Sequence, residues 1–233
     1  MSTGPGKDEV DLHALHGGAY VEKFIRNEAA ASRRFGTLLA RIELHGGARV
    51  LDVGCGSGAL CVALSGRICE YDGVDFSAPF IDAARERASR LGIQGCRFHY
   101  ADAIAFIDSQ GPVFDLIFAL DLSEHVPDAE WAGMVAAFRR GLKEGGQVLL
   151  HTPNRDFIIE RMKQRNILFH QFPEHVAVRT RAENAAFFTN VGFSCVRCEF
   201  FPHYNFLRIL HPASRLPLVG KYLAARLVLV ATR

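Results

Sequence analysis

Short apolar runs alternate with stretches of helical periodicity along most of this chain. A continuous apolar run of about 4–8 residues is typical of a strand buried on both faces of a parallel sheet. Such runs lie at 48–53, 69–74, 96–100, 114–120, 147–151, 193–201 and 226–232. Helices are predicted at 18–42, 59–66, 128–143, 156–169 and 181–191. The alternation indicates an α/β protein built on a mostly parallel sheet.

The most informative segment is VLDVGCGSGAL, from Val50 to Leu60. Its strand carries one carboxylate, Asp52, and is followed by Gly54, Gly56 and Gly58. Glycine adopts positive φ without strain and lets a ligand approach the backbone closely. A strand, a glycine turn and a helix in this order form a nucleotide-type binding site.

Two ligands fit such a turn, a dinucleotide or S-adenosylmethionine. The dinucleotide pattern is G-x-G-x-x-G, whereas this chain has G-x-G-x-G with Leu60 after it. Asp52, two residues before Gly54, would repel a pyrophosphate and suits a ligand that carries an ammonium group and a sulfonium. These residues favour S-adenosylmethionine and leave an NAD-dependent oxidoreductase as the alternative.

The glycine segment, the string EHVPD at 124–128 and the turn KEGG at 143–146 together resemble the class I S-adenosylmethionine-dependent methyltransferases. In motif style they are most similar to the small-molecule O-methyltransferases of the ubiquinone-biosynthesis type. The resemblance implies a Rossmann-like, doubly wound sheet of seven strands in the order 3-2-1-4-5-7-6. The last strand is expected to be antiparallel and the others parallel.

The resemblance also implies where the cofactor binds. Asp75, at the end of the second strand and 23 residues beyond Asp52, is expected to accept the ribose hydroxyls, as an acid does about 20 residues after the loop in NAD-binding folds. Phe76 would pack on the adenine, Asp102 would accept from its amino group, and Tyr20 would reach the cofactor's carboxylate. The implied cofactor-binding residues are Tyr20, Asp52, Gly54, Cys55, Gly56, Gly58, Asp75, Phe76, Asp102, Ala103, Asp121 and Leu122.

The alternative for each acid taken singly is an exposed charge at a strand end, and for Asp102 alone this alternative is favoured. Asp52, Asp75 and Asp102 nevertheless close three successive strands, and ligands of open parallel sheets bind outside those ends. We therefore expect the three carboxylates to lie at one edge of the sheet.

His125 is the candidate catalytic residue, because it follows the fourth strand and imidazole, with an ordinary pKa of about 6.5, suits proton abstraction near neutrality. The alternative is that it only packs at the start of the next helix. Asp121, Glu124 and His125 also resemble an E-x-x-E-H metal segment, with Asp121 in place of the first Glu. Two carboxylates and an imidazole suit a divalent cation. Our prediction is that no metal is bound.

Composition indicates one enzyme-sized domain, since 49% of the 233 residues are hydrophobic and 22% are charged. Residues 1–12 are predicted to be frayed, and 13–233 to form a single methyltransferase domain. A helical lid is expected at about 155–180 and an apolar, basic insertion at about 202–222. No apolar signal-peptide core begins the chain and no run is long enough to span a bilayer, so the expected location is the cytoplasm.

The six cysteines predict neither disulfides nor a metal site. Cys55, Cys61, Cys69 and Cys96 lie in or beside apolar runs and are interpreted as small buried side chains. Cys195 and Cys198, three residues apart on a strand, would point to opposite faces and chelate poorly.

Charge is distributed unevenly along the chain. Residues 1–150 hold 15 Lys and Arg against 20 Asp and Glu, a net charge of −5, whereas residues 151–233 hold 12 against 5, a net charge of +7. This charge favours an anionic small-molecule acceptor, with a solvated basic surface as the plainer alternative, whereas the apolar insertion at about 202–222 suits a hydrophobic acceptor. No nucleic-acid partner is expected. Peripheral contact with a membrane remains an open alternative, and the protein is expected to be a monomer or a homodimer.

The predicted function is methyl transfer from S-adenosylmethionine to a small molecule, most readily to a hydroxyl oxygen. Besides the NAD-dependent oxidoreductase, a catalytically silent S-adenosylmethionine-binding partner protein remains as an alternative.

Overall fold

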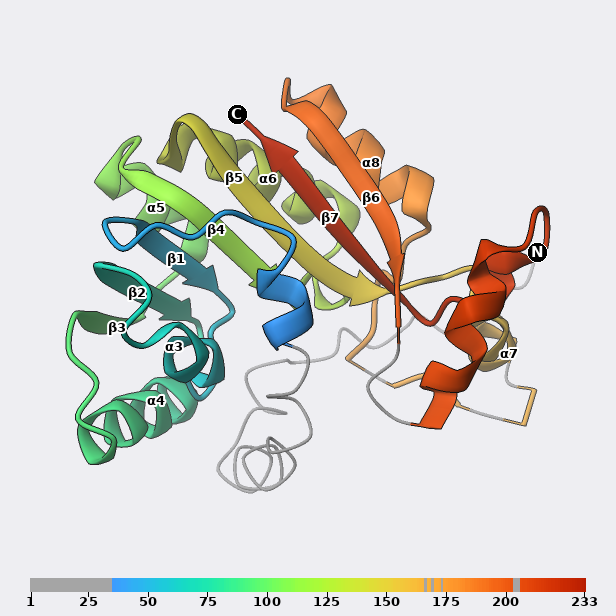
Figure 1. The fold of residues 1–233 in the computed structure, drawn as a ribbon, viewed down its shortest axis with the longest axis horizontal. Coiled ribbons are helices and arrows are strands. Elements are labelled where there is room, and N and C mark those ends of the chain that lie inside the picture. The colour runs from blue at the N-terminus through green and yellow to red at the C-terminus, as the bar shows by residue number, and fades with distance from the viewer. Residues whose placement is uncertain (1–34, 166, 169, 173, 203–205) are drawn as a thin grey trace, which may run out of the picture.

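The computed structural model describes residues 35–165, 167–168, 170–172, 174–202 and 206–233 (Figure 1). The strands are β1 (Arg49–Val53), β2 (Glu70–Asp75), β3 (Cys96–Tyr100), β4 (Phe114–Leu120), β5 (Leu142–Pro153), β6 (Ser194–Phe201) and β7 (Arg226–Thr232). The α-helices are α3 (Ala59–Leu64), α4 (Ala78–Arg90), α5 (Ala103–Gln110), α6 (Asp128–Gly141), α7 (Ile158–Gln164) and α8 (Arg181–Asn190). Residues 35–39 are also helical, and the 3-10 helices are η1 (Ser123–His125), η2 (Phe206–Arg215) and η3 (Gly220–Tyr222).

The strands form one seven-stranded sheet in the order β3-β2-β1-β4-β5-β7-β6. The pairs from β3 through β5 are parallel, and β7 runs antiparallel to both β5 and β6. This confirms the predicted fold class, strand order and antiparallel last strand. The described residues therefore fold around one sheet; the predicted single domain over 13–233 also includes residues outside the described ones, as do the frayed 1–12.

Helices cover both faces of the sheet, and the alternation of side chains along β1 shows how. Leu51 and Val53 pack into a core with α5, α6 and α8, whereas Val50 packs into a second core with α3 and α4. Successive side chains of a strand point to opposite faces, so a strand that is apolar throughout needs a helix layer on each side. Figure 1 shows α5, α6 and α8 on one face of the sheet and α3 and α4 on the other, beside β1 to β3.

The segment predicted as a turn before the fifth strand belongs instead to the strand. Leu142 already pairs with Phe114, the register then shifts, and pairing resumes where Gln147 meets Leu116. Gly145, with a φ of 76°, lies inside this irregularity. The predicted turn residues thus interrupt the pairing of β5 with β4, as a bulge does, while the assigned strand begins earlier than predicted, at Leu142.

Both predicted insertions lie beyond the carboxyl ends of the parallel strands (Figure 1), and Arg161 of α7 lies over the ring of Tyr222 in η3. The predicted lid helix, 156–169, is shorter than expected, since α7 ends at Gln164 and the Ile167 N–H turns back to the Met162 carbonyl at 2.9 Å. The second insertion forms 3-10 rather than α-helix and has Pro212 inside it, where an α-helix would lose a backbone hydrogen bond. Among the described residues, no helix is both long enough and apolar enough to cross a bilayer.

The cysteines are all free thiols. Cys55, Cys61 and Cys198 are buried, but Cys69 is exposed, so its assignment as a buried side chain was wrong. It lies in the connection just before β2, outside both cores. Cys195 is exposed while Cys198 is buried, as expected for two residues that face opposite ways.

Two glycines of α6 give a matched test of the packing of α6 against α5. A Cβ on Gly141 would lie 2.6 Å from Ile107 Cγ2, whereas one on Gly133 would lie at an ordinary 3.6 Å from Ile104 Cδ1. We expect Gly141→Ala to destabilise the fold by about 1–3 kcal/mol through overpacking. Gly133→Ala should instead stabilise it by up to about 1 kcal/mol through helix propensity. Urea denaturation measures both, and shifts of the same sign would contradict this packing.

Candidate active site

The glycine loop after β1 lies directly on the end of β2. Gly54, Gly56 and Gly58 have φ angles of 71°, 50° and 76°, in the left-handed region that other residues adopt only with strain. The N–H groups of Gly54 and Cys55 both donate to the Val74 carbonyl, at 2.8 and 3.1 Å. The predicted strand–turn–helix is therefore held against its neighbouring strand by backbone hydrogen bonds.

Gly73, inside β2, allows this close approach, and the sequence analysis assigned it no role. A Cβ at Gly73 would lie 3.0 Å from Cys55 Sγ and 2.9 Å from Phe98 Cδ1. The signal was a glycine within a predicted buried strand, which marks a close approach of backbone. Gly56, in contrast, has space beside it, because the described atom nearest to a Cβ placed there would be Phe80 Cδ1 at 4.0 Å. The loop thus has open space beside its central glycine.

Asp75 closes β2 and joins it to the loop. Its two carboxylate oxygens accept the N–H groups of Gly56 and Ser77, both at 2.9 Å, and the carboxylate also accepts the N–H of Phe76. Burial raises the pKa of this carboxyl, and the donated N–H groups of Ser77 and Gly56 oppose the rise. Because a carboxylate has about four acceptor positions, Asp75 retains capacity for one further donor, such as a ribose hydroxyl.

Asp52 is buried in β1 and is oriented by a residue that the sequence analysis missed. The Tyr71 hydroxyl, from β2, donates to Asp52 Oδ2 at 2.5 Å. Burial and then the charge of Asp52 raise the pKa of Tyr71, so the phenol stays a donor. The only signal in the sequence was a polar-tipped aromatic residue in a strand beside an acid.

The end of β3 brings Asp102 to the same edge of the sheet. Tyr100 is the strand partner of Asp75, and the Ala101 N–H donates to the Asp75 carbonyl at 3.2 Å. The exposed Asp102 carboxylate caps α5 by accepting the Ala105 N–H at 2.8 Å. Asp52, Asp75 and Asp102 therefore lie at the carboxyl ends of three adjacent strands, with Phe76 half-buried beside them and Ala103 opening α5.

The loop after β4 lies over the glycine loop from the other side. Leu122 Cδ1 would be 3.1 Å from a Cβ on Gly54, so the two loops are in contact. Asp121, with a φ of 53°, accepts from Arg226 Nη1 at 2.6 Å and lies 3.1 Å from His151 Nδ1. The carboxylate is thus engaged with β5 and β7.

His125 ends the 3-10 helix η1, and its tautomer follows from one contact. Its Nδ1 lies 2.8 Å from the Glu174 carbonyl oxygen. A carbonyl oxygen only accepts, so Nδ1 carries the hydrogen and Nε2 carries the lone pair. Within the described part of the chain, no hydrogen bond engages Nε2. The ring is therefore arranged to accept a proton at Nε2.

Two further titratable groups surround His125. Glu124 is buried and accepts from the Thr152 hydroxyl at 3.1 Å, and burial together with the charge of Asp121 raises its pKa. The ring of His175 lies 5.1 Å from that of His125, edge to face. Burial, then the charges of His125 and Arg226, lower the pKa of His175 to about 4.

One group of side chains in the described residues can hold a metal ion, and it differs from the predicted one. Glu124, His125 and His175 each offer a ligand atom within 4.8 Å of the others. Asp121, which the sequence analysis grouped with Glu124 and His125, forms its ion pair with Arg226 instead. Tyr20 lies outside the described residues, so its predicted contact with the cofactor is not placed.

Comparison with known proteins agrees with this geometry. A family model described as a methyltransferase domain matches residues 24–197. The ubiquinone biosynthesis O-methyltransferase of Aromatoleum aromaticum is 36% identical over 111 residues, which cover 48% of this chain and 46% of that protein. The match thus spans about half the length of this curated relative.

Two solved structures share the fold. A SAM-dependent methyltransferase from Archaeoglobus fulgidus aligns with a TM-score of 0.70 at 17% identity, covering 91% of this chain and 99% of that one. The phosphoethanolamine N-methyltransferase 2 of Haemonchus contortus, in complex with S-adenosyl-L-methionine, aligns with a TM-score of 0.74 at 18% identity, covering 98% of this chain and 61% of that one.

The chain belongs to the class I S-adenosylmethionine-dependent methyltransferases, as the family match and the strand order show. S-adenosylmethionine is its cofactor, which decides against the NAD-dependent alternative.

We expect Asp75→Asn to weaken binding of S-adenosylhomocysteine by about 1.5–3 kcal/mol, roughly 10- to 150-fold, the range for hydrogen bonds to a charged group. The amide would also direct N–H groups at the donors of Gly56 or Ser77. Isothermal titration calorimetry measures the affinity. Asp82→Asn, on an exposed carboxylate of α4, is the control and should bind as the unmodified chain does. An affinity unchanged in Asp75→Asn would remove Asp75 from the cofactor site.

His175 predicts a specific pH dependence of stability. Its folded pKa of about 4 lies below the ordinary imidazole value of about 6.5, so between these values the unfolded chain binds a proton that the folded chain does not. Stability contributed by neutral His175 is therefore complete above about pH 6.5 and is lost as the pH falls towards 4. Urea denaturation should show a smaller loss between pH 7 and pH 5 in His175→Gln than in the unmodified chain. Equal losses would contradict the assigned shift.

Proposed function

We propose that this methyltransferase acts on a hydroxyl oxygen of a small molecule and that His125 removes the proton. The observation that carries the proposal is the single tautomer of His125, which leaves the Nε2 lone pair available in the loop that packs on the glycine loop. The partial match to a ubiquinone biosynthesis O-methyltransferase supports oxygen as the acceptor atom.

The residues at the strand ends fit the cofactor by their chemistry. A ribose offers hydroxyl donors, and the Asp75 carboxylate has an acceptor position left beyond the N–H groups that it already binds. Asp52 is a buried carboxylate just before the glycine loop, whose open space lies at Gly56, and its negative charge suits the positive end of an amino-acid moiety. Asp102 keeps one oxygen beyond its helix cap for the adenine amino group. When bound, S-adenosylmethionine supplies a methyl group already activated by its sulfonium.

The part left to the protein is alignment and proton removal. In our proposal His125 Nε2 would take the hydroxyl proton of the acceptor, while the bound cofactor would give its methyl group to the oxygen and leave as S-adenosylhomocysteine. The imidazolium that results keeps its Nδ1–H on the Glu174 carbonyl, whose negative end stabilises the charge. His175, neutral near pH 7 because its pKa is about 4, adds no repelling charge beside that ring.

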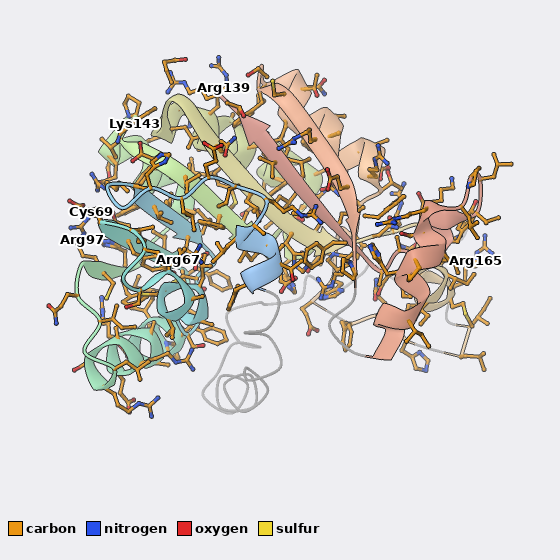
Figure 2. All side chains as sticks on the ribbon, in the orientation of Figure 1. Arg67, Cys69, Arg97, Arg139, Lys143 and Arg165 are labelled. Atoms are coloured by element: carbon orange, nitrogen blue, oxygen red, sulfur yellow. The ribbon has the colours of Figure 1, made fainter. Side chains whose placement is uncertain are left out.

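For the acceptor we infer a hydrophobic rather than an anionic molecule. Several cations of the basic C-terminal third are already paired, including Arg226 with Asp121, Lys163 with Glu160 and Arg155 with Glu183. Apolar side chains on the two insertions, in contrast, are strongly exposed: Leu168 by 83%, Ile209 by 78% and Leu218 by 92%. Figure 2 places Arg165 at the end of the molecule where these insertions lie, away from Arg139 and Lys143. Peripheral membrane contact, a cytoplasmic location and a monomeric or homodimeric state stay predictions.

We expect His125→Gln to lower turnover by roughly 10²–10⁴, the usual contribution of a general base, with the affinity for S-adenosylhomocysteine unchanged. Incubation with S-adenosylmethionine and cell extract, followed by mass spectrometry, reads methyl transfer as the mass of one added CH₂ in an acceptor. His99→Gln, on β3 away from this loop, is the control.

Two outcomes would overturn parts of the proposal. Turnover that is abolished by dialysis against EDTA and restored by a divalent cation would make Glu124, His125 and His175 metal ligands and deprive His125 of its role as base. Binding of S-adenosylhomocysteine without methylation of any acceptor, across extracts and a panel of phenols and alcohols, would instead favour the catalytically silent binding protein.

A further inference from the structure

The end of the lid region runs antiparallel beside the loop that carries His125. Residues 174–179 and 123–126 are joined at successive positions along both segments. His125 Nδ1–H donates to the Glu174 carbonyl at 2.8 Å, and the Ala177 N–H donates to the Glu124 carbonyl at 3.0 Å. The third connection is made by the side chain of Arg179.

Arg179 is a buried arginine whose guanidinium forms hydrogen bonds with the loop on both sides of His125. Nη1 donates to the Ser123 carbonyl at 2.6 Å and Nη2 to the Val126 carbonyl at 2.7 Å, while Nε donates to Asp128 Oδ1 at 2.9 Å. Only 4% of the residue is exposed, and its charge is paired with Asp128 at the start of α6. The two carbonyls bracket the residue pair Glu124–His125.

Two aromatic rings hold the guanidinium in place. Its central carbon lies 5.8 Å from the ring centre of Trp131 and 5.1 Å from that of Phe187. A planar guanidinium can stack on rings and donate in several fixed directions at once, whereas an ammonium cannot. The position therefore requires arginine and not merely a positive charge.

The orientation of His125 depends on the spacing between these two segments. The carbonyl that selects the Nδ1–H tautomer belongs to Glu174, in the same segment as Arg179. If the two segments separate, the imidazole loses its orienting acceptor and both tautomers become available. Ring hydrogen bonds of this kind determine which nitrogen of a histidine is protonated.

We propose that Arg179 is the positioning residue of His125: it clamps the lid segment 174–179 to the loop at 123–126, so that the Glu174 carbonyl holds His125 with Nε2 as the acceptor. The meaning of this arrangement for catalysis rests on the proposed function. The tautomer itself is a property of the free protein and is testable without an acceptor molecule.

The test is the ring nitrogen spectrum of His125 in protein labelled with ¹⁵N-histidine, recorded at pH 8, above the ordinary imidazole pKa of about 6.5. His125→Gln assigns the signal by its disappearance. The unmodified chain should show two well-separated nitrogen shifts with the hydrogen on Nδ1. In Arg179→Lys the two shifts should move towards each other as the tautomers mix, while binding of S-adenosylhomocysteine stays within about twofold.

Two further variants keep the result interpretable. Arg181→Lys replaces the neighbouring arginine, whose guanidinium lies over Phe200 and contacts neither segment, and should leave the His125 spectrum unchanged. Asp128→Asn removes the exposed carboxylate that pairs with Arg179 and should shift the spectrum in the same direction as Arg179→Lys, even if the latter does not fold. A His125 spectrum unchanged in both Arg179→Lys and Asp128→Asn would overturn the inference.

This outcome is distinguishable from failure of the proposed function. A protein that transfers no methyl group to oxygen, yet shows the tautomer loss in Arg179→Lys, would retain the clamp and lose the assignment of His125 as the base. A protein that needs His125 for turnover, yet keeps its tautomer without Arg179, would retain the base and lose the clamp.

Discussion

The contact between the glycine loop and the end of β2 is the constraint on which the cofactor site depends. Three features act together: backbone hydrogen bonds to Val74, the missing side chain of Gly73, and the Asp75 carboxylate that holds the Gly56 N–H. Each brings the loop down onto the strand beside it. Asp75 therefore supports the loop through its hydrogen bond to Gly56, and this contact explains why the residue is buried. The same carboxylate is our proposed ligand for the cofactor. The same packing turns the carboxylates of β1 and β2 towards one edge.

A second pairing builds the catalytic side of the site. The segment 174–179 lies against the loop after β4 and supplies a carbonyl, an amide and a buried guanidinium to it. The loop itself contacts the glycine loop through Leu122. The cofactor site and the candidate base are thus joined through short contacts between loops, on a sheet whose own geometry is determined by apolar burial. The segment 174–179 therefore influences the orientation of the candidate base through these contacts.

Much of the fold followed from apolar periodicity. The bounds of β3, β4 and β7 agree with those predicted, because burial on both faces makes a strand apolar throughout. The predicted bounds and burial differ from the structure where the local sequence pattern and tertiary packing favour different outcomes. Lys143–Gly146 was predicted as a turn and lies within the bounds of β5, where it interrupts the pairing with β4 until Gln147. The lid helix ends at Gln164 although its apolar pattern continues, and Cys69 is exposed although it adjoins an apolar run.

Each of Asp52, Asp75 and Asp102 lies at or just beyond the carboxyl end of a strand in the sequence, and parallel strands present these ends at one edge of the sheet. The sequence therefore determined that the three residues lie at the same edge. The sequence by itself also pointed to His125. Only the tertiary structure decided what each group does beside its neighbours: Tyr71 orienting Asp52, Arg226 taking Asp121, and Arg179 and Glu174 closing on the loop of His125. These partners lie between 19 and 105 residues away along the chain. Hydrogen bonds and ion pairs at such separations leave no periodic trace, because they depend on angles and distances that only the packed sheet and its loops define.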